Sequence, residues 1–239
     1  MPTGPITSPR SPAADPVAVQ TEQGPTGPGR DCPLCPRLVE FRCHLRERHA
    51  EWHNAPVPSF GELGSRLLIV GLGPGLMGAN RTGRPFTGDY AGDLLYATLV
   101  KFGFARGDYV ADRDKGAWRP DTLSLSDARV TNAVRCVPPQ NKPVPAEIAA
   151  CRPFLAAEIA AMPKLKAMVA LGRVAHDATL AALALKGRPY PFAHAAVHEL
   201  PSGLLLADSY HCSRYNTNTG RLTPTMFEAV FAAVKTRLG

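Results

Sequence analysis

Apolar residues follow two patterns along the chain. Short apolar runs bounded by turn-forming residues are typical of buried strands, and longer segments with apolar residues at helical spacing are typical of helices that cover a sheet. Strands are predicted over residues 66–71, 129–134, 166–171, 195–200 and 204–208. Helices are predicted over residues 32–50, 90–102, 145–162, 173–185 and 223–238.

The alternation of strands and helices predicts the fold class. It favours an α/β fold with a central, mostly parallel sheet flanked by helices on both faces, in three layers. Residues 1–30 are rich in Pro, Gly, Thr and Ser, so we expect a disordered tail ahead of a single domain over residues 31–239. Residues 105–127 are polar and irregular, and are expected to form an insertion loop.

The net positive charge of the chain favours one class of binding partner. The 239 residues carry a formal net charge of +7 with a pI near 9.3, which favours a polyanion such as nucleic acid; a basic protein without such a partner is the alternative. No run of eighteen apolar residues occurs, so no membrane span is expected. The N-terminal segment lacks the apolar core of a signal peptide, and we expect a cytoplasmic protein with reduced thiols.

Three polar loops follow predicted strands, after Gly71, near Asn132 and after Asp208. Ligands of parallel α/β folds bind outside the carboxyl ends of the strands. We therefore expect these loops to meet and to form the functional site.

The first loop carries a weak nucleotide-binding pattern. Gly73, Gly75 and Gly78 match G-x-G-x-x-G, but the helix that a dinucleotide site requires is disfavoured by Pro74, Asn80, Thr82, Gly83 and Pro85. A nucleotide-using enzyme of another class is thus disfavoured, and the glycines are better suited to close approach by a flat ligand. In the same loop Phe86 offers a stacking face, or else fills the core. Polar contacts are offered by Asn80, Arg81 and Arg84, with solvated arginines as the alternative.

The other two loops carry hydrogen-bonding and basic groups. Asn132 falls in an apolar strand, where its amide either reads a pyrimidine edge or bonds to a neighbouring backbone group. His211 ends a strand and precedes a polar segment and a helix N-terminus, which suits phosphate binding. A Ser/His/Asp triad lacks the G-x-S-x-G motif that it would need.

Four cysteines predict a metal centre. Cys32 and Cys35 form a C-x2-C pair, and Cys136 and Cys151 form a wider pair in the middle of the chain. In a reducing compartment this pattern favours a metal or iron–sulfur site over disulfides. Spacing alone leaves zinc and iron–sulfur both open, because each accepts four thiolates.

Residues 71–89, 131–143 and 211–224, together with the four cysteines, resemble the three motifs and the cysteine pattern of family 5 (B-type) uracil-DNA glycosylases. The resemblance runs from about Cys32 to the C-terminus. It implies a uracil-DNA glycosylase-like fold and a 4Fe-4S cluster held by Cys32, Cys35, Cys136 and Cys151. Two departures are Met77, where many members carry His, and Cys212, which follows His211 where Pro is usual.

The resemblance also implies site residues. Base binding would fall on Gly71, Leu72, Gly73, Phe86 and Asn132. Catalysis would fall on Asp89, Asn132 and His211. Contacts to DNA would fall on Asn80, Arg81, Arg84, Lys142, Ser213, Arg214, Tyr215, Asn216 and Arg221. Phe86 would stack on a flipped base, His211 would stabilise the leaving base and Asp89 would assist attack by water, although Asp89 also suits the N-cap of the helix over 90–102.

The expected function is therefore a monofunctional DNA-repair glycosylase of the bacterial cytoplasm, associated with the nucleoid. As a monomer, it would excise uracil and other deaminated or modified bases from DNA and leave an abasic site. The alternative is a non-catalytic nucleic-acid-binding module in which the four cysteines hold structural zinc.

Overall fold

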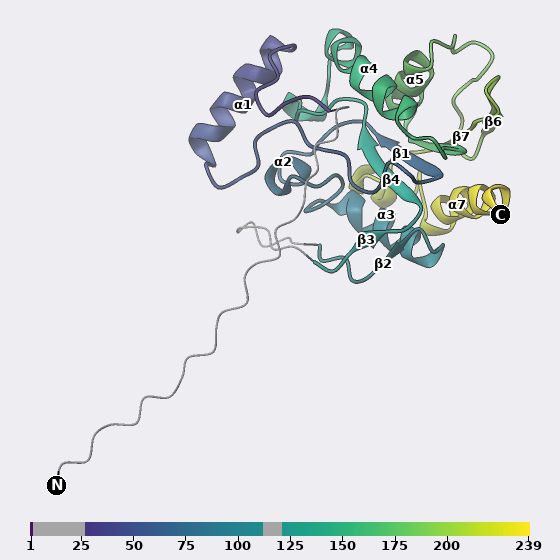
Figure 1. Cartoon of the computed structure of the whole chain (residues 1–239), viewed down its shortest axis with the longest axis horizontal. Coiled ribbons are helices and arrows are strands. Elements are labelled where there is room, and N and C mark those ends of the chain that lie inside the picture. Colours follow the sequence, from purple (N-terminus) through teal and green to yellow (C-terminus); the bar gives the residue numbers. More distant parts are fainter. Residues whose placement is uncertain (2–26, 112–120) are drawn as a thin grey trace.

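The computed structural model describes Met1 and residues 27–111 and 121–239 (Figure 1). A five-stranded sheet lies at its centre, with strand order β4-β1-β5-β7-β6. The strands are β1 (Leu67–Gly71), β4 (Ala128–Asn132), β5 (Ala167–Leu171), β6 (Val197–Glu199) and β7 (Leu205–Ser209). β4, β1, β5 and β7 are parallel, and β6 pairs with β7 in the antiparallel direction at the sheet edge. The mostly parallel sheet is as predicted.

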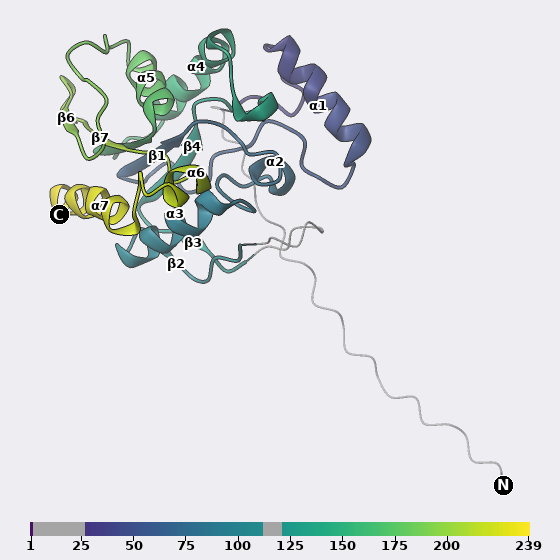
Figure 2. The same ribbon diagram turned by 180° about the vertical axis from the view of Figure 1, so that it is seen from behind.

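Helices cover both faces of the sheet, which confirms the three-layer prediction. The longer helices are α1 (Pro36–Arg48), α3 (Tyr90–Lys101), α4 (Pro145–Ala160), α5 (Arg173–Ala182) and α7 (Pro224–Leu238). α4 and α5 lie on one side of the sheet and α3 and α7 on the other, as the two opposite views show (Figures 1 and 2). α1 stands beyond the end of the sheet that is remote from β6.

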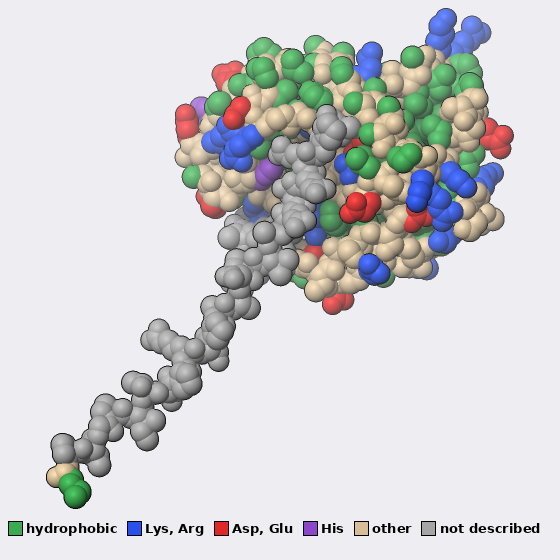
Figure 3. All heavy atoms as spheres, in the orientation of Figure 1, with side chains coloured by type: hydrophobic (Ala, Val, Ile, Leu, Met, Phe, Trp, Pro, Cys, Tyr) green, Lys and Arg blue, Asp and Glu red, His purple; other side chains and the backbone are tan. Residues whose placement is uncertain are grey.

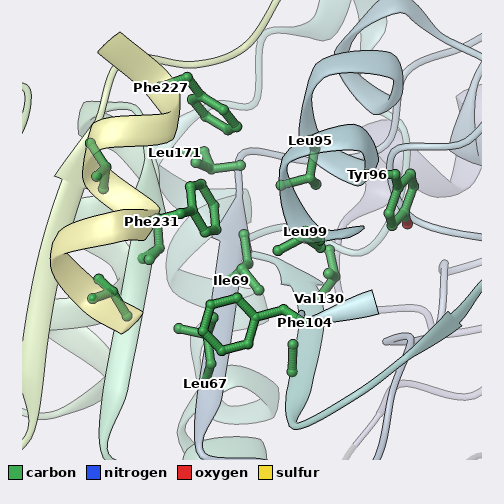
Figure 4. Close-up of a cluster of buried hydrophobic side chains, with 14 of the residues drawn as sticks. Leu67, Ile69, Leu95, Tyr96, Leu99, Phe104, Val130, Leu171, Phe227 and Phe231 are labelled. Atoms are coloured by element: carbon green, nitrogen blue, oxygen red, sulfur yellow. The ribbon is translucent and has the colours of Figure 1, made fainter. Parts of the chain in front are cut away.

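Successive side chains of β1 enter different cores. Leu67 and Ile69 belong to the cluster that faces α3 and α7, where Phe227 and Phe231 pack beside them (Figure 4). Leu68, the residue between them, belongs to a second cluster on the side of α4 and α5. A strand that is buried on both faces reads as an unbroken apolar run, which is why β1 was predictable. Each such side chain contributes about 1.5–3 kcal/mol by burial, so the sheet is a rigid frame for its loops.

Short elements depart from the sequence prediction. The expected insertion loop over 105–127 begins and ends with β2 (Ala105–Arg106) and β3 (Ser124–Leu125), which pair with each other; its residues 112–120 lie outside the described part. Two further helices of one turn, α2 (Ala79–Thr82) and α6 (Arg214–Asn218), and a 3-10 turn over Pro139–Asn141 occur within the polar loops. Such short turns have no hydrophobic periodicity, so the apolar pattern did not indicate them.

The N-terminal part of the domain is attached to α4. Pro36 begins α1 directly after Cys35, and Leu38 is fully buried. Arg37 donates to Glu147 of α4 over 2.7 Å. Of the predicted tail, residues 2–26 lie outside the described part, and the carbonyl of Arg30 accepts a hydrogen bond from Arg46. No helix among the described residues combines the length and the apolar character that crossing a membrane requires.

Candidate active site and cysteine site

The three polar loops meet at one pocket of about 680 Å³. They leave the sheet at the carboxyl ends of β1, β4 and β7, which are parallel and therefore end at the same edge. The predicted site residues that line it are Leu72, Gly73, Arg81, Phe86, Asp89, Asn132, His211, Ser213 and Arg214. The predicted convergence of the loops is confirmed.

Gly71 and Asn132 face each other across the last pair of the β1–β4 ladder. A Cβ atom on Gly71 would collide with Oδ1 of Asn132 and would lie 2.6 Å from Cζ of Phe86. Only glycine therefore leaves the Asn132 amide and the Phe86 ring in place. Among the described residues Asn132 Oδ1 is buried and has no hydrogen-bond partner, so this acceptor is available to a ligand.

Phe86 holds an unusual backbone conformation. Its φ of 52° lies in the left-handed region, which is a genuine outlier for a bulky side chain. Its ring is buried and stacks against the ring of His211, with centroids 6.0 Å apart and planes inclined by 26°. Tyr109 supports this turn, because its hydroxyl donates to the Phe86 carbonyl over 3.3 Å. Strain of this kind persists only where surrounding contacts enforce it, and it often marks a functional site.

His211 lies two residues after β7 and faces the pocket. Its main-chain carbonyl accepts a hydrogen bond of 2.8 Å from Nδ2 of Asn216, which fixes the loop. Burial lowers the pKa of the imidazole to about 4, so the ring is neutral at pH 7. A neutral imidazole can donate one N–H bond into the pocket without bringing a positive charge.

Asp89 is the N-cap residue of α3, as predicted, and its carboxyl faces the backbone N–H groups of the first helical turn without a hydrogen bond of normal geometry. Its side chain makes no capping hydrogen bond, and Oδ1 is buried without a partner among the described residues. Oδ2 lies against the loop backbone, since a Cβ atom on Gly78 would approach it to 2.5 Å. Burial raises the pKa of the carboxyl, and the backbone N–H groups of Gly92 and Ala91 partly oppose that increase.

Two of the predicted DNA contacts are buried and make hydrogen bonds away from the pocket. Arg84 is buried and donates to both carboxylate oxygens of Asp121 over 2.6 Å each. Asn80 is also buried, and its amide donates to Oδ1 of Asn54 over 2.9 Å. Both arrangements favour a structural role. Arg81 does line the pocket, and its Nε donates to the Met77 carbonyl over 3.0 Å.

The remaining predicted contacts surround the mouth of the pocket or lie at the surface. Ser213 caps α6, and the Arg214 guanidinium lies 5.4 Å from the ring centroid of Tyr90. Tyr215 is 73% exposed, while Arg221 lies over the ring of Tyr210. Lys142 is exposed. On the face drawn in Figure 3, Lys and Arg side chains stand in separate groups.

Sequence reasoning missed several residues that line the pocket. Tyr90, Pro138 and Asn141 contribute to its wall, whereas Met77, which also lines it, was already evident from the sequence as a departure from the family motif. Asn141 has a φ of 56° and ends a short turn. The prolines before it indicated a turn, but nothing in the local sequence indicated that this side chain lines the pocket. Tyr90 opens α3 directly after Asp89, so the helix prediction placed its backbone but not the direction of its ring.

The four predicted cysteine ligands line one apolar cavity between α1, α4 and the loop after β4. Other groups approach their sulfurs. Arg42 is buried and its Nη1 lies 3.6 Å from Sγ of Cys136, and the backbone N–H of Arg135 donates to Sγ of Cys151 over 3.4 Å. N–H groups directed at sulfur stabilise thiolates, which are the ligand form of cysteine.

The arrangement of the sulfurs can be compared with the ligand shell of a single zinc ion. Four thiolates on a single zinc ion would lie about 3.8 Å apart, given Zn–S bonds of about 2.3 Å. Among the described residues the one set of three or more ligand atoms within 4.8 Å of one another is formed by His176, His198 and Asp208. No three of the four cysteine sulfurs, all of which belong to the described residues, therefore lie within 4.8 Å of one another. Four cysteine thiolates are a ligand set that both a zinc ion and an iron–sulfur cluster accept.

Comparisons with known proteins agree with this geometry. Residues 58–235 match the model of the uracil DNA glycosylase superfamily. The chain is 42% identical to the type-5 uracil-DNA glycosylase of Thermus thermophilus, over 87% of this chain and 94% of that protein. It is 42% identical to the Mycobacterium bovis type-5 enzyme over 87% of this chain and 78% of that protein, and 37% identical to that of Pyrobaculum aerophilum over 81% and 83%.

The chain belongs to the type-5 uracil-DNA glycosylases. The superfamily match covers the whole five-stranded sheet and every residue that lines the pocket. It also contains Cys136 and Cys151, whereas Cys32 and Cys35 precede it. The fold thus carries the pocket of a uracil-DNA glycosylase, and the segment before residue 58 adds the second half of the cysteine site.

Proposed function

We propose that the protein hydrolyses the N-glycosidic bond of uracil in DNA, acts also on other deaminated or modified bases, and leaves an abasic site. The observation that carries this proposal is the grouping of an aromatic ring, an unpaired amide oxygen and a neutral imidazole around one pocket, provided by Phe86, Asn132 and His211. The type-5 relatives, which are named uracil-DNA glycosylases, support the same reaction.

The pocket suits an extruded base. A glycosylase must take its target nucleotide out of the stack and hold the base between apolar or aromatic surfaces. Phe86 supplies such a surface, and its strained turn fixes the ring in place. Asn132 Oδ1 can accept the N–H of the uracil edge, while the other end of the amide donates to an adjacent carbonyl oxygen. Gly71 keeps the floor of this pocket open.

His211 would stabilise the leaving base. Cleavage of the glycosidic bond develops negative charge on the base oxygen, and a preorganised N–H donor near that oxygen lowers the barrier. The low pKa keeps the imidazole neutral before the reaction. The hydrogen bond from its N–H group to the base oxygen then becomes stronger as negative charge develops on that oxygen. The Asn216 bond to the His211 carbonyl holds the ring in its stack on Phe86.

Asp89 would act on the sugar side. The same cleavage develops positive charge on the deoxyribose, and a carboxylate can stabilise this charge or orient the attacking water. Asp89 lines the pocket and keeps one oxygen without a partner among the described residues. The pocket also lacks a lysine among the residues that line it, which supports a monofunctional reaction without a Schiff base.

The segment around α6 would contact DNA. Ser213 and Arg214 lie at the pocket, and Tyr215 presents an exposed ring beside them. Arg214 and Arg221 suit phosphate contacts, with Asn216 fixing the loop and Lys142 and Arg81 contributing from the neighbouring loops. Tyr215 would enter the space that the extruded nucleotide leaves, since inserted side chains keep a base from restacking.

The four cysteines would hold a 4Fe-4S cluster. This proposal is supported by their shared cavity and by N–H groups directed at two of the sulfurs. Thiolate ligands to such a cluster would connect the segment before α1 with the loop after β4 and with α4. Iron and sulfide analysis of protein purified without oxygen should give about four of each per chain.

The test of the reaction is cleavage of a labelled oligonucleotide that contains one uracil. We expect cleavage at uracil only after alkali treatment and none in a thymine control. His211→Asn should lose at least 100-fold in the single-turnover rate. The exposed residue His44 offers a control, and His44→Asn should retain the rate. Binding of uracil-containing DNA without cleavage of any damaged base would instead favour a non-catalytic module.

A further inference from the structure

A second group of polar side chains lies away from the pocket, at the edge of the sheet. His176 comes from α5, His198 from β6 and Asp208 from β7, and none of them lines the pocket. His176 Nδ1 lies 2.7 Å from Asp208 Oδ1, and His198 Nε2 lies 3.4 Å from Asp208 Oδ2. One ligand atom from each residue lies within 4.8 Å of the other two.

The group is buried and one of its nitrogens has no partner. Asp208 is fully buried and His176 is 1% exposed, whereas the side chain of His198 is 12% exposed. His198 Nε2 is itself buried and makes no hydrogen bond with any described residue. An unpaired buried nitrogen costs free energy, and it is directed at a carboxylate that a second imidazole already contacts. A cation that accepts a lone pair from each of the two imidazole nitrogens and from the carboxylate would remove this cost.

The ring nitrogen of His176 that faces away from Asp208 makes the kind of hydrogen bond that is typical of metal-binding histidines. Its Nε2 lies 2.9 Å from the carbonyl oxygen of Tyr190 and donates to it. A histidine that ligates a metal through one ring nitrogen almost always donates the other N–H to a carbonyl or carboxylate, which fixes the tautomer. With Nε2 donating to Tyr190, Nδ1 becomes the ligand atom, and Nδ1 is the nitrogen that faces Asp208.

We propose that His176, His198 and Asp208 bind one divalent transition-metal ion of the zinc class. Two imidazole nitrogens and one carboxylate are a common ligand set for such ions. Ligands on a tetrahedral ion with bonds of about 2.0–2.1 Å lie roughly 3.3 Å apart. His198 Nε2 already lies at about this distance from Oδ2 of Asp208, whereas His176 Nδ1 lies 2.7 Å from the other oxygen, Oδ1, so coordination through a single carboxylate oxygen requires a small rearrangement of His176 and Asp208. The ion replaces the proton between His176 and Asp208, and three protein ligands leave one position for water.

Such an ion would fasten the edge of the sheet. β6 is a three-residue strand held to the sheet by β7 alone, and the chain between α5 and β6 has no regular structure. The ion would tie α5, β6 and β7 to one another, and Tyr190 would bring the intervening loop to the same point (Figure 1). Asp208 lies three residues before His211, so the fastened strand also supports the loop of the pocket.

The experiment uses the full chain with its cysteine centre loaded. Zn²⁺ is added at pH 7.5, unbound ion is removed, and bound zinc is counted and examined by X-ray absorption at the zinc edge. We expect one zinc per chain that is lost in His198→Gln, with a first shell of nitrogen and oxygen at about 2.0–2.1 Å and no sulfur shell at about 2.3 Å. The control His44→Gln should bind as the parent does, because His44 is exposed on α1.

Thermal unfolding gives a second readout on the same proteins. Zn²⁺ should raise the midpoint for the parent and for His44→Gln, and should leave that of His198→Gln unchanged, because an ion stabilises only the state that binds it. A zinc shell that contains sulfur, or no retained zinc in the parent, would overturn the proposal even if the variant failed to fold. Equal zinc binding by folded His198→Gln would also overturn it. None of these readouts depends on glycosylase activity.

Discussion

Gly71 and Asn132 are paired across β1 and β4, and the missing side chain of Gly71 creates the space that the Asn132 amide occupies. A single methyl group at Gly71 would meet both Asn132 Oδ1 and the Phe86 ring. The positions of the base-binding amide and of the stacking ring therefore both require that residue 71, the last residue of buried strand β1, has no side chain.

Gly71→Ala should fold but lose uracil excision by about 100-fold or more. The methyl group must displace the Asn132 amide or the Phe86 ring, and small displacements at an active site cost about this much. Single-turnover rates and thermal unfolding check this outcome. Gly64→Ala is the matched control, because its added Cβ would meet no atom within 4 Å. Normal excision by folded Gly71→Ala would show that the Asn132 position is not required.

Much of this site was predictable from local sequence. β1 is a continuous apolar run. An amide such as Asn132 inside an apolar strand needs a hydrogen-bond partner, either a ligand or a neighbouring backbone group, and the resemblance of the surrounding motif favoured the ligand. Parallel strands end at the same edge, so the loops had to meet.

The rest depends on contacts between distant residues. Arg84 reads as a phosphate ligand in a polar loop, but its partner Asp121 lies 37 positions further along the chain. Asn80 is likewise occupied by Asn54. The left-handed turn at Phe86 and the missing capping hydrogen bond of Asp89 arise from packing, and no local pattern encodes them. The His176–Asp208 pair joins a helix to a strand and is equally invisible in local sequence.

Asp89→Asn should keep or increase stability while excision falls by at least 100-fold. The carboxylate makes no capping bond and its pKa is raised by burial, so the folded state disfavours its charge and neutral Asn removes that cost. Catalysis needs the ionised carboxylate. As the pH is lowered, the activity of the parent protein should therefore begin to fall at a pH above the ordinary pKa of an aspartate. Unfolding midpoints and single-turnover rates test both points. A residue that only caps α3 would give a loss of roughly 1 kcal/mol with activity retained.

His211 should make stability depend on pH below neutrality. Its pKa is about 4 in the folded protein and near 6.5 unfolded, so the unfolded state binds the proton first as pH falls. Its contribution is complete above about pH 6.5 and is lost progressively between pH 6.5 and 4. In His211→Asn the loss of unfolding free energy between pH 7.5 and 4.5 should be smaller by about 1–3 kcal/mol. Urea titrations at the two pH values measure it, and identical losses in both proteins would contradict the neutral imidazole.

Tyr215→Ala should impair excision from double-stranded DNA and spare single-stranded DNA. The ring is 73% exposed, so the fold does not depend on it. A side chain that fills the space of an extruded nucleotide matters only where a base can restack in a duplex. Parallel assays on single- and double-stranded uracil substrates provide the control within one protein. Equal losses on both substrates would assign Tyr215 to general DNA binding instead.

Cys136→Ser should lose iron and loosen the attachment of α1. Apart from the cysteine site, this helix is held to the domain by buried Leu38 and Leu45, by hydrogen bonds with Asn54, and by the bond between half-exposed Arg37 and Glu147. An exposed ion pair contributes little, so α1 should then open more often than the sheet does. Iron content and amide hydrogen exchange over residues 36–48 measure the two effects.

Cys43→Ser separates this effect from general thiol loss. Cys43 belongs to α1 but is exposed and does not line the cysteine cavity, so the variant should keep its iron and its slow exchange. If Cys136→Ser lost iron while α1 stayed as protected as in the parent, the cluster would not be what fastens the helix. Leu38 and the contacts of Arg42 would then suffice, and the cluster would need a role at the DNA surface rather than in the fold.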